Sequence, residues 1–526
     1  MTKRPHQLFW KWFPYVLVVL IGIFFHFYNF SKASFFYADQ GNDLLIAKAI
    51  LEEGHRPFAG PLLSARGIFI PPTYYYMLAA FLAVGKTPFG TALMFAVFNL
   101  ITMVGLMMAA EKLVDRKTGV IAGLLFSITV VVQEHGRYMW QPHPVLWFAT
   151  GMLVCFLLAR EQKKIAWLIL GTLSYVLAVS VYPSAILLVS YVWYQTIRLY
   201  RFITKESVGA ALKFTLVSHI ALGALIYAPF FVFEFTHGFP TYHALFSASF
   251  GPPLSIGETV SMYTQNFLTF AESVANQAYI LRSNSAPLTT ALFVGVFMVW
   301  GWLRRAGAMK QEWVEFLGLP WVFFGWLGVL FYRLEIFHWR SFYLLPLWIL
   351  LFSIVIRVGM TKRQFAVACV VGVLVFFYTL GNLLRFYRWE LLQPLNRLDY
   401  YASAARAIED SMQKNGYDPQ DVAVVVFTPD DEQTSWEATP VLYFLHEDTG
   451  LPVSLVADGN NIDTRSAVSS PTPAKYLMCS EYPSIEKIQS GCVAAFLKVN
   501  TGYVQKDSWL FDDNAMIFLY VALPPV

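Results

Sequence analysis

The sequence contains few charged residues, and this scarcity argues against an ordinary soluble protein. Charged side chains make up 14% of the 526 residues, whereas a soluble protein carries about 25%. Hydrophobic residues account for 57% and aromatic residues for 17%. They gather in repeated apolar runs of about 20 residues, the length that crosses a bilayer. The composition therefore indicates a polytopic membrane protein.

Cysteine is also scarce, and no Cys and His spacing resembles a zinc site. Cys155 and Cys369 lie in apolar segments, where they act as small hydrophobic residues. Cys479 and Cys492 lie 13 positions apart in a more polar part of the chain. If that part is outside the cytoplasm, a disulfide is expected, and two buried thiols are the alternative.

Charge is distributed unevenly along the chain. Residues 391–526 contain 18 acidic and 8 basic residues, while the remainder contains 16 acidic and 30 basic residues. Basic residues of membrane proteins usually mark cytoplasmic loops, so this charge does not indicate a nucleic-acid partner. We expect a transmembrane domain over residues 1–388 and an extracytoplasmic α/β domain over residues 389–526.

Apolar length and loop charge together predict a mainly α fold with eleven transmembrane helices. The stretch 71–85 is apolar but short, and it begins with two prolines. Excluding it as a span places five Lys/Arg clusters in the cytoplasm, whereas including it places all five outside. The expected spans are 12–30, 88–110, 118–134, 144–160, 164–181, 184–200, 209–233, 286–304, 314–332, 339–357 and 364–385.

This topology places a first loop, 31–87, and a second loop, 235–285, on the outer face together with the C-terminal domain. Residues 71–85 would then form a helix on the outer membrane surface. In the C-terminal domain, the pattern predicts helices over 399–415 and 436–447 and strands over 422–428, 452–457, 475–479, 494–499 and 515–522.

The first outer loop concentrates the polar chemistry. Asp39 and Asp43 are four residues apart, so a helix over 40–53 would place both carboxylates on one face. Gly54 can end that helix, and Pro57 prevents its continuation. A polar loop with capping aspartates would explain the same residues.

Arginines gather at the same predicted face. Arg66 follows in the first loop, Arg137 lies where one span ends, and Arg340 lies where a late span begins. Arginine suits phosphate because its planar group binds two oxygens. Snorkelling, or a pair such as Arg340 with Glu335, would also explain them. Further candidates for substrate contact are Tyr74, Tyr75, Trp140, Gln141 and His143. The aromatic belt of any membrane protein would also explain the tyrosines and Trp140.

Three stretches within the first ~160 residues resemble a bacterial branch of the GT-C glycosyltransferase superfamily. That superfamily includes the protein O-mannosyltransferases and the lipid A aminoarabinose transferase. The stretches are DQGNDLLIAKAILEEGHRPFAGP, GIFIPPTYYYMLA and GRYMWQPHPV. The resemblance implies a polyprenyl-phosphate sugar donor and an acidic base in the first outer loop, which Asp39 matches. Asp43 matches a second acid, and Arg66, Arg137 and Arg340 match basic positions that we expect to bind the donor phosphate.

These features predict an inverting glycosyltransferase at the outer face of a bacterial plasma membrane. It would move a sugar from the lipid-linked donor to a hydroxyl of a glycan, lipid or protein acceptor. A transporter or flippase would instead line a mid-membrane path with charge, and no carboxylate occurs in mid-span. An assembly subunit would act through the C-terminal domain alone. The sequence identifies no cofactor and leaves the sugar, the acceptor and any need for a divalent metal open.

Overall fold

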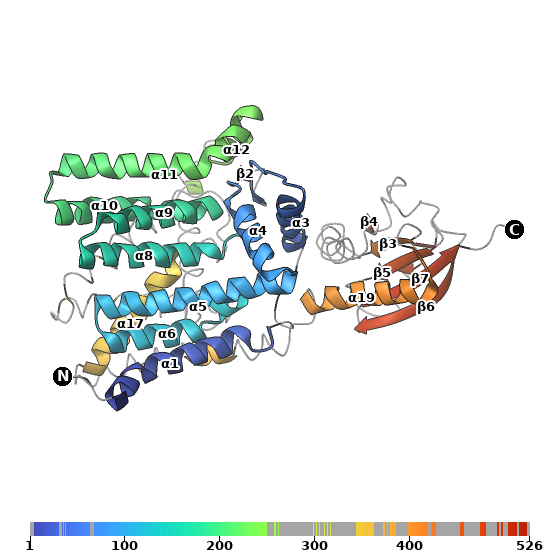
Figure 1. Ribbon diagram of the computed structural model, residues 1–526, viewed down its shortest axis with the longest axis horizontal. Helices are drawn as coiled ribbons and strands as arrows, with labels where there is room; N and C mark the ends of the chain where they lie inside the picture. The colour runs from blue at the N-terminus through green and yellow to red at the C-terminus, as the bar shows by residue number, and fades with distance from the viewer. Residues whose placement is uncertain are drawn as a thin grey trace. The chain divides into compact units, whose positions relative to one another are not determined.

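The computed structural model describes most of the first 249 residues and separate segments of the rest (Figure 1). The chain divides into two compact units: residues 1–30, 54–86 and 90–392, and residues 31–53, 87–89 and 393–526. The described positions are 5–30, 34, 36, 38–63, 68–137, 139–249, 257–258, 261, 298, 301, 305, 310, 313, 316, 343–361, 372–373, 376, 379–384, 398–418, 422–427, 453–456, 474–479, 492–493, 496–497, 503–512 and 515–522.

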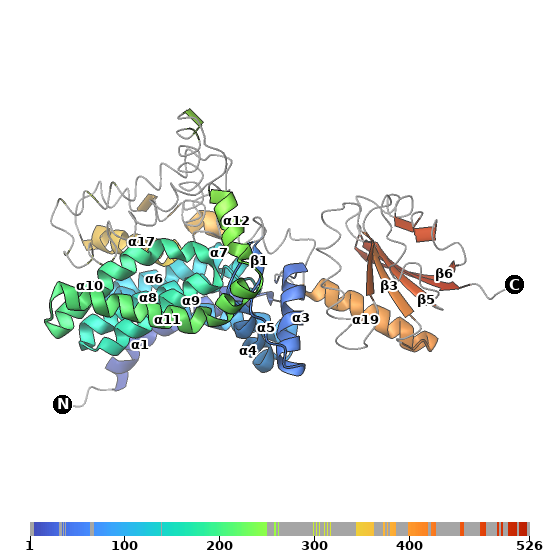
Figure 2. The same cartoon turned by 90° about the horizontal axis from the view of Figure 1, so that it is seen from above.

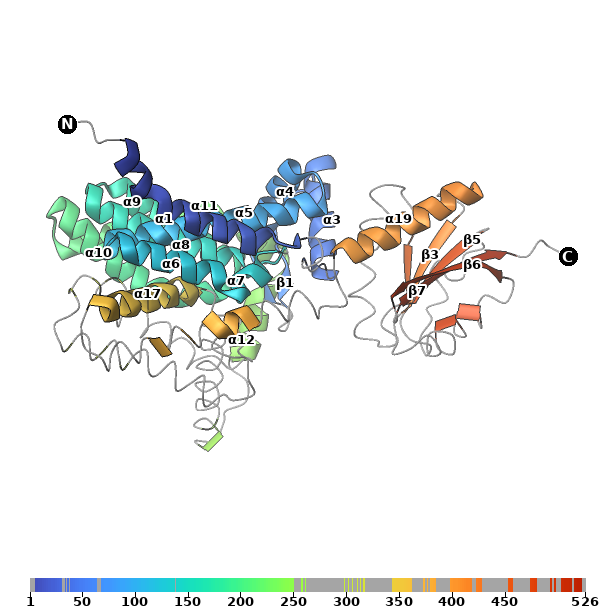
Figure 3. The ribbon, with the colours of Figure 1, turned by 90° about the horizontal axis from the view of Figure 1, so that it is seen from below.

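The first unit is a bundle of apolar helices. In Figure 1, α8, α9, α10 and α11 lie side by side with their axes nearly parallel. In Figure 3, α6 lies between α1 and α17. The helices are α1 (Pro5–Phe27), α4 (Thr73–Gly85), α5 (Pro88–Leu113), α6 (Arg116–Ile128), α7 (Val130–His135), α8 (Pro144–Gln162), α9 (Ile165–Val181), α10 (Val189–Thr204), α11 (Val208–Thr236), α12 (Pro240–Ser249) and α17 (Leu345–Thr361), with a 3-10 turn at Pro183–Leu188.

The described helices make the chain a multi-pass membrane protein. By length and composition, α5, α8 and α11 can each cross a bilayer. Four shorter apolar helices accompany them, at Trp12–Phe27, Thr73–Gly85, Ile165–Val181 and Leu345–Val358. The expected spans 286–304, 314–332 and 364–385 lie wholly or largely outside the described residues, so the count of eleven stays a prediction.

The expected continuous span 118–134 is instead two helices, α6 and α7. Thr129 interrupts them with an extended backbone, φ −73° and ψ 103°. The amide of Val130, which begins α7, donates to Oδ1 of Asn382 at 2.9 Å. A distant side chain thus satisfies the backbone group that the break exposes. An apolar run alone does not reveal such a partner.

Near its end, α5 is joined by side-chain contacts to α1 and to α8. The Tyr15 hydroxyl donates to a carboxylate oxygen of Glu111 at 2.5 Å. Lys112 forms an ion pair with Glu161 of α8. Glu111, Lys112 and Glu161 lie in the last turns of α5 and α8, at helix ends that the loop charges assign to the cytoplasmic side.

A small hairpin within residues 62–69, in the loop predicted to lie outside, contacts the start of α12. Strand β1 (Leu62–Leu63) pairs antiparallel with β2 (Ile68–Phe69). The amide of Phe69 donates to Oγ1 of Thr241 at 3.2 Å. The amide of Thr241 in turn donates to the Glu234 carboxylate at 3.3 Å. The hairpin therefore joins an early loop to the α11–α12 junction, which Figure 2 shows from above.

The second unit contains an α/β domain in which α19 (Leu398–Asn415) covers one face of a sheet (Figures 2 and 3). The sheet order is β4-β3-β5-β7-β6. Strand β3 is parallel to β4 and β5, while β7 is antiparallel to β5 and β6. The Tyr476 hydroxyl on β5 donates to Oγ of Ser411 on α19 at 2.9 Å. The strands are β3 (Val422–Phe427), β4 (Val453–Val456), β5 (Ala474–Cys479), β6 (Tyr503–Asp512) and β7 (Ala515–Ala522).

Most predicted elements of this domain are confirmed within two residues, including α19, β3, β4, β5 and β7. The strand expected over 494–499 is wrong, because Phe496 and Leu497 are helical. The ring of Phe496 packs 4.7 Å from that of Tyr520, so its apolar side chain is buried without a strand. Cys479 and Cys492 form the expected disulfide. The expected helix 436–447 lies outside the described residues.

Candidate active site

Helix α3 (Ala38–Glu52), in the second unit, carries both predicted acids. Its bounds agree with the expected helix over 40–53, and Gly54 ends it with φ +67°. Asp39 lies within the first turn rather than before it, so it is not the capping residue. A carboxylate in this turn is favoured by the unsatisfied amides of the helix N-terminus.

The two acids have different surroundings. Asp43 is 3% exposed and belongs to a buried stripe with Gln40, Leu44 and Ala47, spaced as on one helix face. Asp39 is exposed at the border of that stripe. Desolvation nevertheless raises the pKa of the Asp39 carboxyl above its ordinary value. Asp39 is therefore a stronger base than a fully hydrated aspartate, and it remains accessible.

Arg137 belongs to the first unit, in the turn between α7 and α8. Its side chain is only 1% exposed, and one guanidinium nitrogen donates to the Phe25 carbonyl at 2.7 Å. Phe25 lies in the last turn of α1, where the unsatisfied carbonyls attract a cation. Arg137 therefore has a structural contact in addition to the phosphate role that the sequence predicts for it.

His143 ends the same turn and is 1% exposed. Its Nε2 lies 2.6 Å from Oδ1 of Asn99 on α5, and the indole nitrogen of Trp147 donates to the same oxygen at 2.7 Å. His26 of α1 lies within electrostatic reach of both His143 and Arg137. Burial, followed by the proximity of His26, lowers the pKa of His143 to about 3. The imidazole of His143 is consequently neutral at pH 7.

The remaining described candidates lie on two elements of the first unit. Gln141 shares the buried turn with Arg137 and His143, and its Oε1 has no hydrogen-bond partner among the described residues. Trp140, on the same turn, is half-buried. Tyr74 and Tyr75 are buried in α4 with ring centroids 6.3 Å apart. The turn thus collects four of the predicted residues at positions 137–143.

Arg66 and Arg340 lie outside the described residues, Arg66 within the stretch 64–67 that joins β1 to β2. Their assignment to the donor phosphate stays a prediction. Across the described part of the chain, no group of three His, Cys, Asp or Glu side chains is placed to hold a metal ion.

Residues 70–232 match the model of a family described as dolichyl-phosphate-mannose-protein mannosyltransferase. ArnT from Cupriavidus metallidurans in the apo state gives a TM-score of 0.57 at 10% identity, covering 98% of each chain. Its complex with undecaprenyl phosphate gives 0.55 at 11% identity, covering 97% of this chain and 98% of that one. This is the GT-C glycosyltransferase fold. The expected resemblance and the expected enzyme class are therefore confirmed.

A longer protein is matched less well than ArnT. The Archaeoglobus fulgidus oligosaccharyltransferase in complex with Zn and sulfate gives a TM-score of 0.45 at 14% identity. That match covers 82% of this chain, which spans 61% of the length of the oligosaccharyltransferase. A search of the curated proteins found no match.

Reasoning from the sequence missed three residues of this site, Asn99, His26 and Trp147. Asn99 interrupts the apolar run of α5, and a buried polar residue in such a run needs hydrogen-bond partners. His143 and Trp147 are four residues apart at the start of α8, so they face the same side. The polar residue in α5 and the four-residue spacing in α8 are the sequence signals that point to a contact of Asn99 with His143 and Trp147.

Proposed function

We propose that this chain transfers a sugar from a polyprenyl-phosphate donor to an acceptor hydroxyl, with inversion at the anomeric carbon. The observation that supports this most is helix α3, which presents an exposed Asp39 of raised pKa beside the buried Asp43. The family match over 70–232 and the shared fold support the donor class, since ArnT of that fold binds undecaprenyl phosphate. The outer face of the plasma membrane is the proposed location.

In the proposed reaction, Asp39 acts as the general base. As the acceptor oxygen attacks the anomeric carbon, its proton passes to the Asp39 carboxylate. The bond between that carbon and the phosphate oxygen breaks, and polyprenyl phosphate leaves with the electron pair. Because the hydroxyl loses its proton only as the donor bond breaks, a carboxylate is a sufficient base.

Arginine is proposed to stabilise the leaving phosphate. Negative charge grows on the phosphate as the sugar departs, and a guanidinium group can bind two of its oxygens. Among the described residues Arg137 is the candidate for this role, and we propose the same role for Arg66 and Arg340. The buried turn with Gln141 and His143 is proposed to contact hydroxyl groups of the substrate.

A panel of labelled lipid donors tests this function directly. The purified protein in lipid nanodiscs is incubated with undecaprenyl-phosphate-linked sugars, and both released undecaprenyl phosphate and labelled product are measured. We expect one donor to be consumed with equal release of the lipid phosphate. Movement of an intact donor across the bilayer without release would instead favour a flippase. Glycan binding by the C-terminal domain with no consumption would favour an assembly subunit.

A further inference from the structure

Asn99 uses its side-chain amide to hold three groups at once. Its oxygen lies 2.6 Å from Nε2 of His143 and 2.7 Å from the indole nitrogen of Trp147. Its nitrogen donates to the carbonyl of Val132 at 3.0 Å. The residue is fully buried in α5, so its side-chain amide needs partners within the protein. The Val132 carbonyl also accepts from the Gly136 amide at 3.0 Å, so Asn99 and the turn share this acceptor.

The partners of Asn99 determine which way its amide points. An indole nitrogen can only donate, so the atom that faces Trp147 must be the amide oxygen. The carbonyl of Val132 can only accept, so the atom that faces it must be the amide nitrogen. Both contacts require the same orientation. The usual ambiguity of an Asn side chain is therefore resolved here.

This orientation also determines the proton position on His143. Because the Asn99 oxygen cannot donate, the Nε2 atom of His143 must carry a hydrogen and donate it. In a neutral imidazole, the other nitrogen, Nδ1, then carries the lone pair and accepts hydrogen bonds. The surroundings favour the neutral form, since His143 is buried and lies within reach of His26.

The packing around Asn99 leaves little freedom for another arrangement. A Cβ added at Gly136 would lie 1.7 Å from the amide nitrogen of Asn99, so the turn passes directly over it. On the other side, the ring of Trp147 packs against those of Phe95 and Phe98 at 5.1 and 5.2 Å. The hydrogen-bond geometry at His143 is thus held by the backbone turn and by an aromatic cluster.

We propose that Asn99 is a positioning residue that holds His143 as the neutral Nε2–H tautomer, so that Nδ1 accepts a hydrogen bond from a substrate hydroxyl. This rests on the proposed glycosyltransferase function and deepens it. A neutral acceptor orients a hydroxyl without removing its proton. The role of base is then left to Asp39, and His143 selects for a sugar or acceptor that presents a hydroxyl at this position.

Nitrogen NMR of histidine tests the tautomer without any substrate. The full-length protein is labelled with ¹⁵N-histidine in lipid bilayers, and the His143→Gln spectrum is subtracted to assign one of the ten histidines. At pH 6.5 we expect His143 to show one protonated nitrogen, Nε2, and one unprotonated nitrogen, Nδ1. In Asn99→Asp the carboxylate favours the imidazolium, so both nitrogens become protonated. A wild-type His143 with its proton on Nδ1 would overturn the proposal.

Kinetics with the labelled lipid donor test the role in binding. In His143→Gln, the amide nitrogen can replace Nε2 as the donor to Asn99, but no acceptor remains in the place of Nδ1. We expect KM to rise about tenfold or more while kcat changes less than threefold, with an unchanged melting temperature. Asn99→Asp should raise the same KM, because Nδ1 then donates. A rise confined to the donor KM identifies a donor-sugar hydroxyl, and a rise confined to the acceptor KM identifies an acceptor hydroxyl.

A matched control separates this role from a general effect on the bundle. Ser127 is a buried residue of α6 whose hydroxyl donates to the Gly123 carbonyl at 2.8 Å and contacts Met103 of α5. Ser127→Ala should leave both KM values unchanged. Unchanged KM values in His143→Gln as well would overturn the proposal. A wild-type protein that consumes no lipid donor would contradict the proposed function, while the nitrogen spectrum still decides the tautomer.

Discussion

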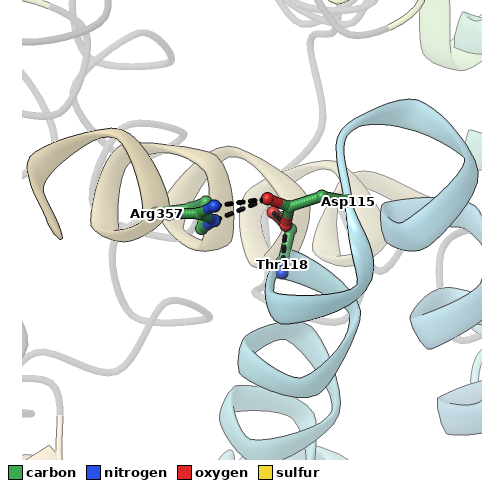
Figure 4. A network of polar contacts seen from close by, with 3 residues as sticks. All are labelled: Asp115, Thr118 and Arg357. Atoms are coloured by element: carbon green, nitrogen blue, oxygen red, sulfur yellow. Dashed lines mark hydrogen bonds and ion pairs between the residues drawn. The ribbon is translucent and has the colours of Figure 1, made fainter. Parts of the chain in front are cut away.

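Arg357 binds Asp115 through two guanidinium nitrogens, although the residues lie 242 positions apart (Figure 4). The nitrogens lie 2.6 and 2.7 Å from Oδ2 of Asp115. The other carboxylate oxygen accepts from the amide and hydroxyl of Thr118, so Asp115 also caps α6. A single carboxylate thus joins α17 to the start of α6. The predicted topology places both residues at the cytoplasmic side.

The first prediction is that this pair stabilises the protein above pH 4. Burial opposes ionisation, but the hydrogen bonds from Arg357 and Thr118 outweigh it and lower the pKa of Asp115 to about 2. The stabilisation is therefore complete above the unfolded pKa near 4 and is lost as pH falls toward 2. Asp115→Asn retains the cap but loses the charge, and should lower the unfolding free energy by on the order of 1 kcal/mol. Melting in detergent at pH 7 measures the loss.

Glu161→Gln provides the matched control for this pair. It removes the ion pair with Lys112, which is exposed at both side chains. Exposed pairs contribute roughly 0–1 kcal/mol, so its melting temperature should stay close to that of the wild type. An equal fall in melting temperature in the two variants would show that the Asp115–Arg357 pair stabilises the protein no more than an exposed ion pair does.

The second prediction concerns the disulfide between Cys479 and Cys492. It closes a short loop beside β5, and the chain-entropy model gives roughly 3 kcal/mol for a loop of about 15 residues. Replacing both residues with Ser should make the C-terminal domain more sensitive to limited proteolysis, while Cys155→Ser should not. Peptide mapping without reduction checks the bond itself. Two free thiols in protein taken from cells would contradict it.

Helix α3 illustrates what the sequence can and cannot predict. Helix α3 was predicted within two residues because local signals set its limits: Asp39 at the start, then Gly54 and Pro57 beyond the end. The different burial of Asp39 and Asp43 could not be predicted from their spacing. It depends on which side chains cover the helix, and residue spacing does not give these.

Elements without a local signal were missed for similar reasons. Strand β6 carries exposed polar residues such as Lys506 and Asp507, so it lacks the apolar alternation expected of a strand. The break at Thr129 depends on Asn382, a residue 253 positions away in the sequence. Asn99 is a single polar residue in an apolar run, and its role depends on His143 and Trp147, which lie more than 40 positions away.

The third prediction separates the two roles of Arg137. Arg137→Ala removes a buried charge and its bond to the Phe25 carbonyl, so both stability and donor use should fall. Arg137→Lys keeps the charge but loses the planar fork, so the fold should be largely retained while the donor KM rises. Melting and transfer kinetics are measured on the same preparations. A normal donor KM in a folded Arg137→Lys protein would limit Arg137 to its structural role.

The fourth prediction concerns the sides of the membrane. Single cysteines are introduced at exposed residues in a protein with Cys155 and Cys369 replaced by Ala, and whole cells or spheroplasts are treated with an impermeant thiol reagent. His55→Cys and Gln505→Cys should react, because the loop charges place both outside. Glu206→Cys, between α10 and α11, should react only after lysis. The reverse pattern would invert the topology.

The fifth prediction concerns the pH dependence and catalysis of Asp39. Because desolvation raises the pKa of its carboxyl, transfer should decline as pH falls through that raised value, where the base becomes protonated. Asp39→Asn keeps the size and polarity of the side chain in the first turn of α3 but cannot accept a proton. Asp43→Asn makes the same chemical change at the buried aspartate one turn away, and it is the comparison variant for Asp39→Asn.

The most direct measurement is the transfer rate of Asp39→Asn with a saturating labelled lipid donor, compared with wild type and Asp43→Asn at equal melting temperature. We predict that Asp39→Asn loses about a hundredfold or more in kcat, the range of lost general-base catalysis, and that Asp43→Asn loses less. If Asp39→Asn transfers sugar at the wild-type rate, Asp39 is not the base, and the proposed mechanism is contradicted.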